Sequence, residues 1–306
     1  MNNDETILAA LDPELMDDLV TRRDVLKRST TVAAALALGS VPVALAVLTK
    51  EAHAQSTDVT SVLNFALALE IFENEFYKAV LGTSSSSAQN NAFATVRAQI
   101  PAAAVTAVQQ IQKHEAAHVA TLLAAGATNT LNLNADSFDF TGNRGNSTPG
   151  PFQRATTELA FLLAVAQGAE DTGVRAYKGQ AANLLTNRPV LESALRIHSV
   201  EARHASKIRR LRRANGAPSV VKYSGTVSGG GAAAAGVSNI SSPPQAVVDT
   251  FNLIYAAEDT TTQGTVDITS KVPNGGALAA SEAFDEPLTK AQVIAIVQPF
   301  FKPTLS

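Results

Sequence analysis

Apolar residues recur at steps of three and four along four long stretches of the chain, which is the periodicity of one helical face. These stretches cover residues 61–81, 102–125, 156–182 and 189–214. In the first, the face consists of Leu63, Ala66, Leu67, Glu70, Asn74 and Tyr77. Each stretch exceeds 20 residues, or about 30 Å of helix. Long helices of similar length favour an all-α helical bundle.

Residues that start or stop helices stand at the borders of these stretches. Gly82, followed by the serine run 84–87, ends the first, and Gly126 ends the second. Pro189 suits the first turn of the fourth helix, and Gly216 follows its end as a C-cap signal. The second and third helices are separated by residues 127–151, a connection that is long for a compact domain. The pattern predicts two antiparallel helix pairs joined by one long crossover within a bundle domain at 55–215.

The composition changes after residue 216. Residues 228–236 are rich in Gly and Ala and predict a linker. Short helices are predicted at 246–257 and at 289–298, the latter opened by a capping-box pair, Thr289 and Gln292. We expect this C-terminal extension, 216–306, to wrap the bundle or to contact another subunit.

The first 54 residues have the pattern of an export signal. Thr21–Lys27 carries the pair Arg22-Arg23 and resembles the twin-arginine signal, with Val25 where that signal usually has Phe. An uncharged stretch, 31–48, and the A-x-A pattern of residues 52–54 follow. The resemblance implies recognition by the twin-arginine translocase and a periplasmic or extracellular location. The alternative is a retained membrane anchor, although Gly39 and Pro42 make a weak span.

Composition narrows the chemistry. The chain has no Cys, which excludes disulfides, thiolate metal sites, iron–sulfur clusters and cysteine catalysis. The net charge is −3, and removal of residues 1–54 takes away 5 basic and 8 acidic residues, which leaves 19 of each. A neutral chain argues against a nucleic-acid partner. The basic run 203–213 is explained more simply by its place at a helix C-terminus, where cations are favoured.

Two motifs are repeated in the same order in the two halves of the chain. Glu70 has Tyr77 seven residues later, and Glu170 has Tyr177 at the same distance. The other motif is E-x-x-H, which places a carboxylate and an imidazole on one helix face. It occurs in the second and fourth predicted helices, as Glu115 with His118 and as Glu201 with His204. The match indicates duplication of a helix pair.

These residues form the donor set of a carboxylate-bridged pair of metal ions. On these motifs, residues 57–213 resemble the bacterial ferritin-like domain family, relatives of desiccation-related proteins, and residues 281–289 resemble the ending of bacterial members. The resemblance implies a ferritin-like four-helix bundle with two iron or manganese ions. Glu115 and Glu201 would bridge the ions, and Glu70, Glu170, His118 and His204 would be terminal ligands. Tyr77 and Tyr177 would contact the ligands from outside or act as one-electron donors.

Neighbouring residues leave alternatives open. Glu73, one turn from Glu70, is an alternative ligand, and His198 is either close to the site or an ordinary buried histidine. Asp171 and His114 are each adjacent to a candidate ligand on a helix and are expected to point away from it, Asp171 to solvent.

Three functions fit this donor set. The first is a redox enzyme that reacts with oxygen or peroxide in stress protection, of the ferroxidase, peroxidase or catalase type. The second is iron storage, which would need a hollow cage. The third is a structural desiccation protectant without turnover. The sequence leaves the choice between iron and manganese, and the presence of a homo-oligomer, undecided.

Overall fold

The computed structural model describes residues 57–217, 239–258, 260–263, 266–272 and 276–306. The predicted export signal and the predicted linker at 228–236 lie outside these residues, so both remain predictions, as does the division of the chain at residues 54 and 215. Among the described residues, no helix has both the length and the apolar character needed to cross a membrane.

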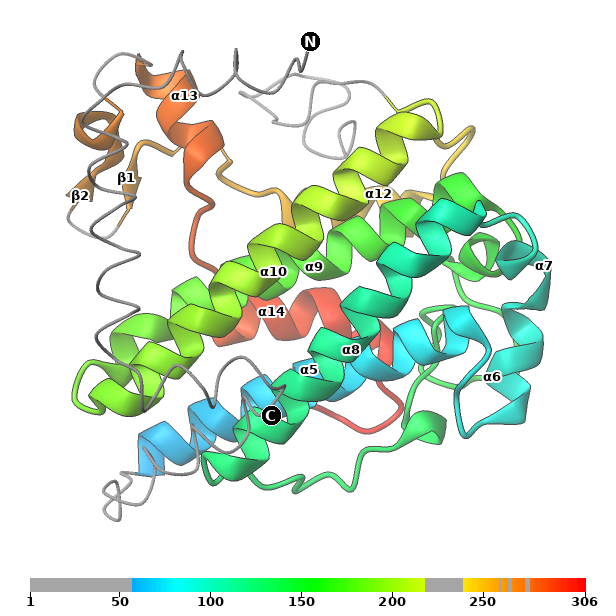
Figure 1. Cartoon of the computed structure of the whole chain (residues 1–306), viewed down its shortest axis with the longest axis horizontal. Coiled ribbons are helices and arrows are strands. Elements are labelled where there is room, and N and C mark those ends of the chain that lie inside the picture. Colours follow the sequence, from blue (N-terminus) through cyan, green and yellow to red (C-terminus); the bar gives the residue numbers. More distant parts are fainter. Residues whose placement is uncertain (1–56, 218–238, 259, 264–265, 273–275) are drawn as a thin grey trace, which may run out of the picture.

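The expected all-α fold is confirmed. Its four long helices are α5 (Thr57–Leu81), α8 (Ala102–Ala124), α9 (Leu159–Ala181) and α10 (Arg188–Ala214). Helix α5 packs along α8, and α9 packs along α10, so the pairs are those expected from the sequence (Figure 1). Burial of their facing apolar stripes, not intrinsic helix propensity, stabilises such a bundle.

Helix ends follow the predicted signals. After α8, Gly126 has a φ of 98°, which residues other than glycine adopt at a steric cost. Its N–H donates to the carbonyl of Leu123, and the N–H of Ala127 donates to that of Leu122. These two bonds form a Schellman motif, which satisfies helix carbonyls that would otherwise lack donors. The same pattern ends α5 at Gly82.

The connection between α5 and α8 holds two short helices that were not predicted, α6 (Ser87–Ala92) and α7 (Ala94–Arg97). Arg97 holds this connection to the bundle, because its guanidinium donates to the carbonyls of Ala79, Val80 and Asn90.

The long crossover passes beside the C-terminus. It contains the 3-10 helix η1 (Ala135–Ser137), and a second one, η2 (Gln153–Thr156), precedes α9. Phe138 forms an isolated β-bridge with Phe301, and the N–H of Asp139 donates to the carbonyl of Phe300. A cluster of phenylalanine rings packs here, with centroids 5.0 to 6.5 Å apart. The rings come from α5, from the residue just before α7, from the crossover and from the C-terminal segment. The crossover is therefore fixed between the bundle and the chain's end.

The described part of the C-terminal extension packs on the bundle, which is the first of the two arrangements expected from the sequence. It contains α12 (Gln245–Ile254), the strands β1 (Thr262–Gln263) and β2 (Val266–Asp267), and the 3-10 helix η4 (Ile268–Lys271). Then follow α13 (Gly276–Ala283), α14 (Lys290–Val297) and η5 (Gln298–Phe300), while the short 3-10 helix η3 (Ala182–Leu184) directly extends α9. Helices α12 and α14 both pack on α9. Thr289 and Gln292 form the predicted capping box of α14, whereas α12 ends three residues earlier than predicted.

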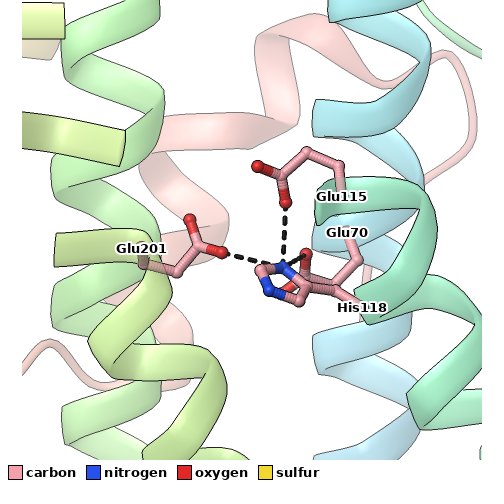
Figure 2. A group of neighbouring side chains, drawn as sticks. All are labelled: Glu70, Glu115, His118 and Glu201. Carbon is pink, nitrogen blue, oxygen red and sulfur yellow. Dashed lines mark hydrogen bonds and ion pairs between the residues drawn. The ribbon is translucent and has the colours of Figure 1, made fainter. Parts of the chain in front are cut away.

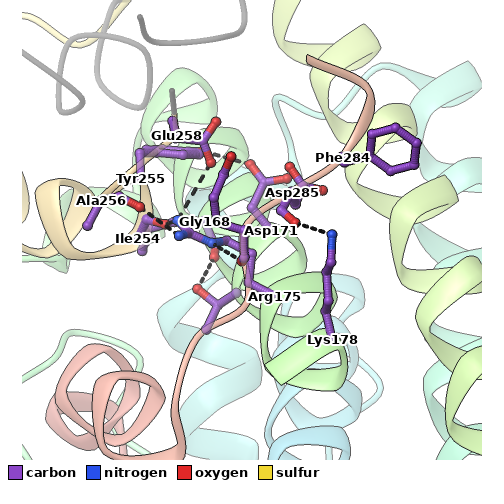
Figure 3. A network of polar contacts seen from close by, with 12 residues as sticks. Gly168, Asp171, Arg175, Lys178, Ile254, Tyr255, Ala256, Glu258, Phe284 and Asp285 are labelled. Atoms are coloured by element: carbon purple, nitrogen blue, oxygen red, sulfur yellow. Dashed lines mark hydrogen bonds and ion pairs between the residues drawn. The ribbon is translucent and has the colours of Figure 1, made fainter. Parts of the chain in front are cut away.

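A buried arginine on α9 holds the extension. Arg175 is 1% exposed and donates to the carbonyls of Ile254, Ala256 and Glu286 (Figure 3). Its guanidinium also lies 3.6 Å from a carboxylate oxygen of Glu258. Carbonyls at the end of α12 and in the segment before α14 thus share one planar donor group, which fixes both segments to α9.

Candidate metal centre

The eight predicted site residues come together in the middle of the bundle. Helices α5 and α9 each contribute a glutamate and a tyrosine, and α8 and α10 each contribute a Glu-x-x-His pair. The three-residue spacing places both side chains of a pair on one helix face. All eight side chains are buried, and the four glutamates have no exposed surface at all.

His118 is the centre of a first group of ligand atoms. Its Nδ1 lies 3.0 Å from Oε2 of Glu70, 3.0 Å from Oε2 of Glu115 and 2.9 Å from Oε1 of Glu201. Figure 2 shows the three carboxylates pointing at this ring nitrogen from three different helices. One nitrogen and three carboxylate oxygens within 4.8 Å of one another form a group that could hold a metal ion.

His204 is the centre of a second group. Its Nδ1 lies 2.7 Å from Oε1 of Glu115, 3.3 Å from Oε2 of Glu170 and 3.7 Å from Oε2 of Glu201. Glu115 and Glu201 therefore belong to both groups, each with one oxygen toward each histidine. Glu70 belongs only to the first group and Glu170 only to the second.

Several of these atoms need a cation. Within the described chain, the ion pairs of the four glutamates are all with the two histidines. Despite the short distances, five of these atoms have no hydrogen-bond partner among the described residues. They are both oxygens of Glu201, Oε1 of Glu115, Oε2 of Glu170 and Nδ1 of His204. Buried polar atoms are usually paired, and four buried carboxylates repel one another. Oxygen and imidazole donors suit iron or manganese, so the residues fit a pair of such ions.

The electrostatics of the cluster agree with this need. Burial, together with the charges of Glu201 and Glu115, raises the pKa of Glu70 to about 8 despite the nearby His118. Burial also raises the pKa of Glu170 well above its usual value. For Glu201, burial acts upward, but the attraction of the two nearby histidines, His118 and His204, outweighs it and lowers the pKa to about 2. For His204, burial is outweighed by the surrounding carboxylates, and the pKa is raised to about 12. Without cations, the cluster holds protons in their place.

The two tyrosines cross between the halves. The hydroxyl of Tyr77 on α5 donates to Oε1 of Glu170 on α9, and the hydroxyl of Tyr177 on α9 donates to Oε1 of Glu70 on α5 at 2.5 Å. Each tyrosine thus fixes the carboxylate that belongs to one group only. Because these bonds occupy the outer oxygens, Oε2 of both glutamates stays directed at the histidines.

The sequence of the bundle matches the model of a protein family. A model of the ferritin-like domain matches residues 58–214, which is more than half of the chain and includes all eight residues. The chain belongs to the ferritin-like domain family. Searches among curated proteins and among solved structures found no match.

Two expectations for this ferritin-like bundle were wrong. Asp171 does not point to solvent: it is 2% exposed, pairs with Arg209 and accepts a hydrogen bond of 2.7 Å from Tyr255. The reason is that α12 and other parts of the extension cover a second face of α9. The sequence signal for this burial was the uncharged stretch 161–168, because a helix that is apolar on all sides is buried on all sides.

His114 does not point away from the site either. Its Nδ1 lies 2.9 Å from Nε2 of His204, and the two rings stack with centroids 5.1 Å apart. Although His114 precedes Glu115 on α8, its ring reaches α10, because the two helices are neighbours at this level. His114 is an exposed residue, so it lies between the buried ligand and the surface. Sequence reasoning missed it because the contact joins two helices.

Glu73 and His198, the two undecided residues, lie close to the cluster but in neither group. Glu73 is buried, and its pKa is raised well above the usual value by burial and by the charges of four neighbouring glutamates. His198 is partly buried, and its Nε2 has no hydrogen-bond partner among the described residues.

The basic run 203–213 does not serve only the helix C-terminus. Two of its residues bind partners inside the protein: Arg209 pairs with Asp171, and Arg212 donates to the side chain of Gln167.

Proposed function

We propose that this ferritin-like protein holds two iron or manganese ions and uses them in redox chemistry with oxygen or peroxide, as protection against stress. The observation that carries the proposal is the sharing of Glu115 and Glu201 by two carboxylate–histidine groups. Shared carboxylates hold two ions about 3.5–4 Å apart and offset their charge. When bound, such a pair supplies reversible electron transfer to a small oxidant.

Each residue then has a defined role. Glu115 and Glu201 would bridge the two ions, with His118 and Glu70 completing one site and His204 and Glu170 the other. Tyr77 and Tyr177 would orient the terminal carboxylates through their hydroxyl groups, and as buried phenols in contact with these ligands they could each supply one electron. The apolar helices around the cluster exclude bulk water from it.

We also propose that the protein is exported by the twin-arginine pathway to the periplasm or cell exterior. The support is the motif at residues 21–27 followed by the uncharged stretch 31–48. Twin-arginine export carries folded proteins, which would let the metal ions be inserted before export. Absence of cysteine suits an oxidising compartment.

Metal content is the decisive measurement. We expect about two iron or manganese ions per chain in natively folded, exported protein, measured by plasma mass spectrometry. The double variant Glu115→Ala/Glu201→Ala should lose both ions, since each residue serves both groups. Glu192→Ala, on the exposed face of α10, is the matched control and should keep them. Metal-loaded protein should then consume peroxide, or oxygen in the presence of ferrous iron.

The opposite result is equally clear. If wild-type protein binds no iron or manganese, even on reconstitution, the metal-centre proposal is wrong. Two bound ions without any consumption of oxygen or peroxide would leave metal binding in place and overturn the redox part.

A further inference from the structure

Two apolar pockets lie on opposite sides of the metal-ligand level, one toward each end of the bundle. The first, which we call the Tyr77 pocket, is lined among others by Tyr77, Leu162, Leu163, Ala166, Val108 and Ile208. The second, the Tyr177 pocket, is lined among others by Tyr177, Val62, Leu63, Ala66, Ala194 and Leu122. Both pockets draw side chains from all four long helices.

The internal duplication relates the two pockets position by position. The offset of 100 residues that relates Glu70 to Glu170 also relates Ala66 to Ala166 and Tyr77 to Tyr177. The offset of 86 that relates Glu115 to Glu201 also relates Val108 to Ala194 and Leu122 to Ile208. A packing defect would have no reason to occur twice at equivalent positions, so the pockets are features of the duplicated unit.

One tyrosine separates each pocket from the candidate metal centre. The tyrosine that lines it is buried and donates its hydroxyl hydrogen to a terminal glutamate: Tyr77 to Glu170, and Tyr177 to Glu70. Other lining residues, such as Leu211 in the first pocket and Val62 in the second, are only partly buried. Each pocket therefore lies between partly buried side chains of the bundle and a tyrosine that contacts a candidate ligand.

The size and lining of the pockets select a small apolar molecule. Each has a cavity volume of about 20 Å³, which is room for about one water-sized molecule. No charged side chain lines either pocket, and each has one amide, Asn215 in the first and Gln180 in the second. A water needs two to four polar partners, and peroxide needs partners for its two hydroxyl groups. A diatomic gas needs none.

We propose that the two pockets bind dioxygen and admit it to the metal centre, one pocket to each end. The proposal rests on the proposed function and deepens it, because it selects dioxygen over peroxide as the oxidant that enters by these routes. The two equivalent pockets match two equivalent terminal glutamates. A third apolar cavity, lined by Phe72, Ala169, Phe251 and Ile296 among others, contacts neither tyrosine and has no such role.

Xenon is a suitable probe, because it binds apolar cavities of this kind without any metal or reaction. We expect crystals of the full, metal-free protein under xenon pressure to show xenon beside Tyr77 and beside Tyr177. Ala166→Leu should remove xenon from the Tyr77 pocket alone, and Ala66→Leu from the Tyr177 pocket alone, so each variant controls the other. Xenon in neither pocket, or only in the third cavity, would overturn the proposal.

Oxygen kinetics test delivery. In ferrous-loaded protein, the double variant Ala66→Leu/Ala166→Leu should consume oxygen about tenfold more slowly at unchanged metal content, because access then limits the rate. Its reaction with peroxide should change less than twofold. Ala169→Leu, which fills the third cavity, is the control and should react like wild type.

The two proposals fail differently. Wild-type oxygen consumption in the double variant would overturn delivery through these pockets and leave the metal centre standing. If wild-type protein binds xenon at both tyrosines but never consumes oxygen, delivery and the oxygen reaction are both wrong.

Discussion

At the scale of single residues, the two halves of the centre differ in how their histidines are supported. Nε2 of His204 lies against Nδ1 of His114, whereas the duplicated position on α10 is Val200, which has no polar side chain. A histidine that binds a metal through Nδ1 carries its proton on Nε2 and usually donates it to a partner that fixes the ring. His114 is such a partner for one site only.

Replacement of His114 should therefore weaken one metal site selectively. We expect His114→Ala to lower affinity at the His204 site by about 10- to 100-fold and to leave the His118 site unchanged. Calorimetric titration of metal-free protein with manganese should resolve one tight and one weakened site. His198→Ala removes a nearby histidine that contacts neither group and serves as the control. Equal weakening of both sites would show that the loss acts through the fold instead of through His204.

At the scale of elements, the close approach of the extension to α9 depends on a residue without a side chain. A Cβ at Gly179 would lie 1.8 Å from the carbonyl oxygen of Leu288. The N–H of Leu288 donates to the carbonyl of Arg175 at 3.1 Å, so the chain is held against the helix there. Glycine inside α9 is thus required by packing, although it weakens an isolated helix.

Gly179→Ala should destabilise the protein, although replacement of Gly by Ala inside a helix usually stabilises it. In an open helix interior, Ala stabilises relative to Gly by about 1 kcal/mol, but here the methyl group collides with backbone. We expect a net loss of roughly 1–3 kcal/mol in the free energy of unfolding, measured by urea denaturation, and faster proteolysis of the extension. Gly168→Ala is the control, because its Cβ would meet no backbone, only the end of the Ile254 side chain at 3.0 Å and the Phe251 ring at 3.2 Å, and both side chains border a cavity. Stabilisation by Gly179→Ala would contradict the described packing.

Elements and site differ in how far the sequence predicts them. The four long helices were predicted to within four residues at each end, because apolar periodicity and glycine caps act locally. The motif pairs foretold which side chains gather, since residues three and seven apart share a face. Helices α6 and α13 were missed because polar or Gly- and Ala-rich segments carry no periodic signal. Contacts between elements, such as His114 with His204 or Asp171 with Arg209, depend on how the helices pack against one another. The sequence of either segment alone therefore cannot predict them.

At the scale of the whole molecule, the centre connects the two helix pairs in the middle of the bundle. Its ligands come from α5, α8, α9 and α10, so bound ions would connect both halves of the duplication. The same buried carboxylates weaken the metal-free bundle once they lose their protons, because the chain offers them no lysine or arginine among the described residues. Metal ions and protons should therefore compete in stabilising one global fold.

This competition predicts different pH responses for the metal-free and the metal-loaded form. For Glu70, whose pKa is raised from 4.5 to about 8 in the folded state, the stabilisation is fully present below pH 4.5 and is lost as the pH rises through 8. The pKa values of Glu170 and His204 are also raised in the folded state, so both residues act in the same direction. The pKa of Glu201 is lowered to about 2, so this residue titrates below this window. The melting temperature of metal-free protein should fall between pH 5 and pH 8.5.

Metal-loaded protein should show no such fall, because ion binding replaces the protons and strengthens as the ligands ionise. At neutral pH, with free ion at about 100 times its dissociation constant, each occupied site adds about 2.7 kcal/mol to the free energy of unfolding. Two sites should therefore raise the melting temperature by roughly 10 °C or more. Differential scanning calorimetry of both forms across the pH range measures this, and Glu70→Gln should flatten the metal-free profile. A metal-free protein whose melting temperature instead rose toward pH 8.5 would mean that the carboxylates are already neutralised, and the cluster would have no need of a cation.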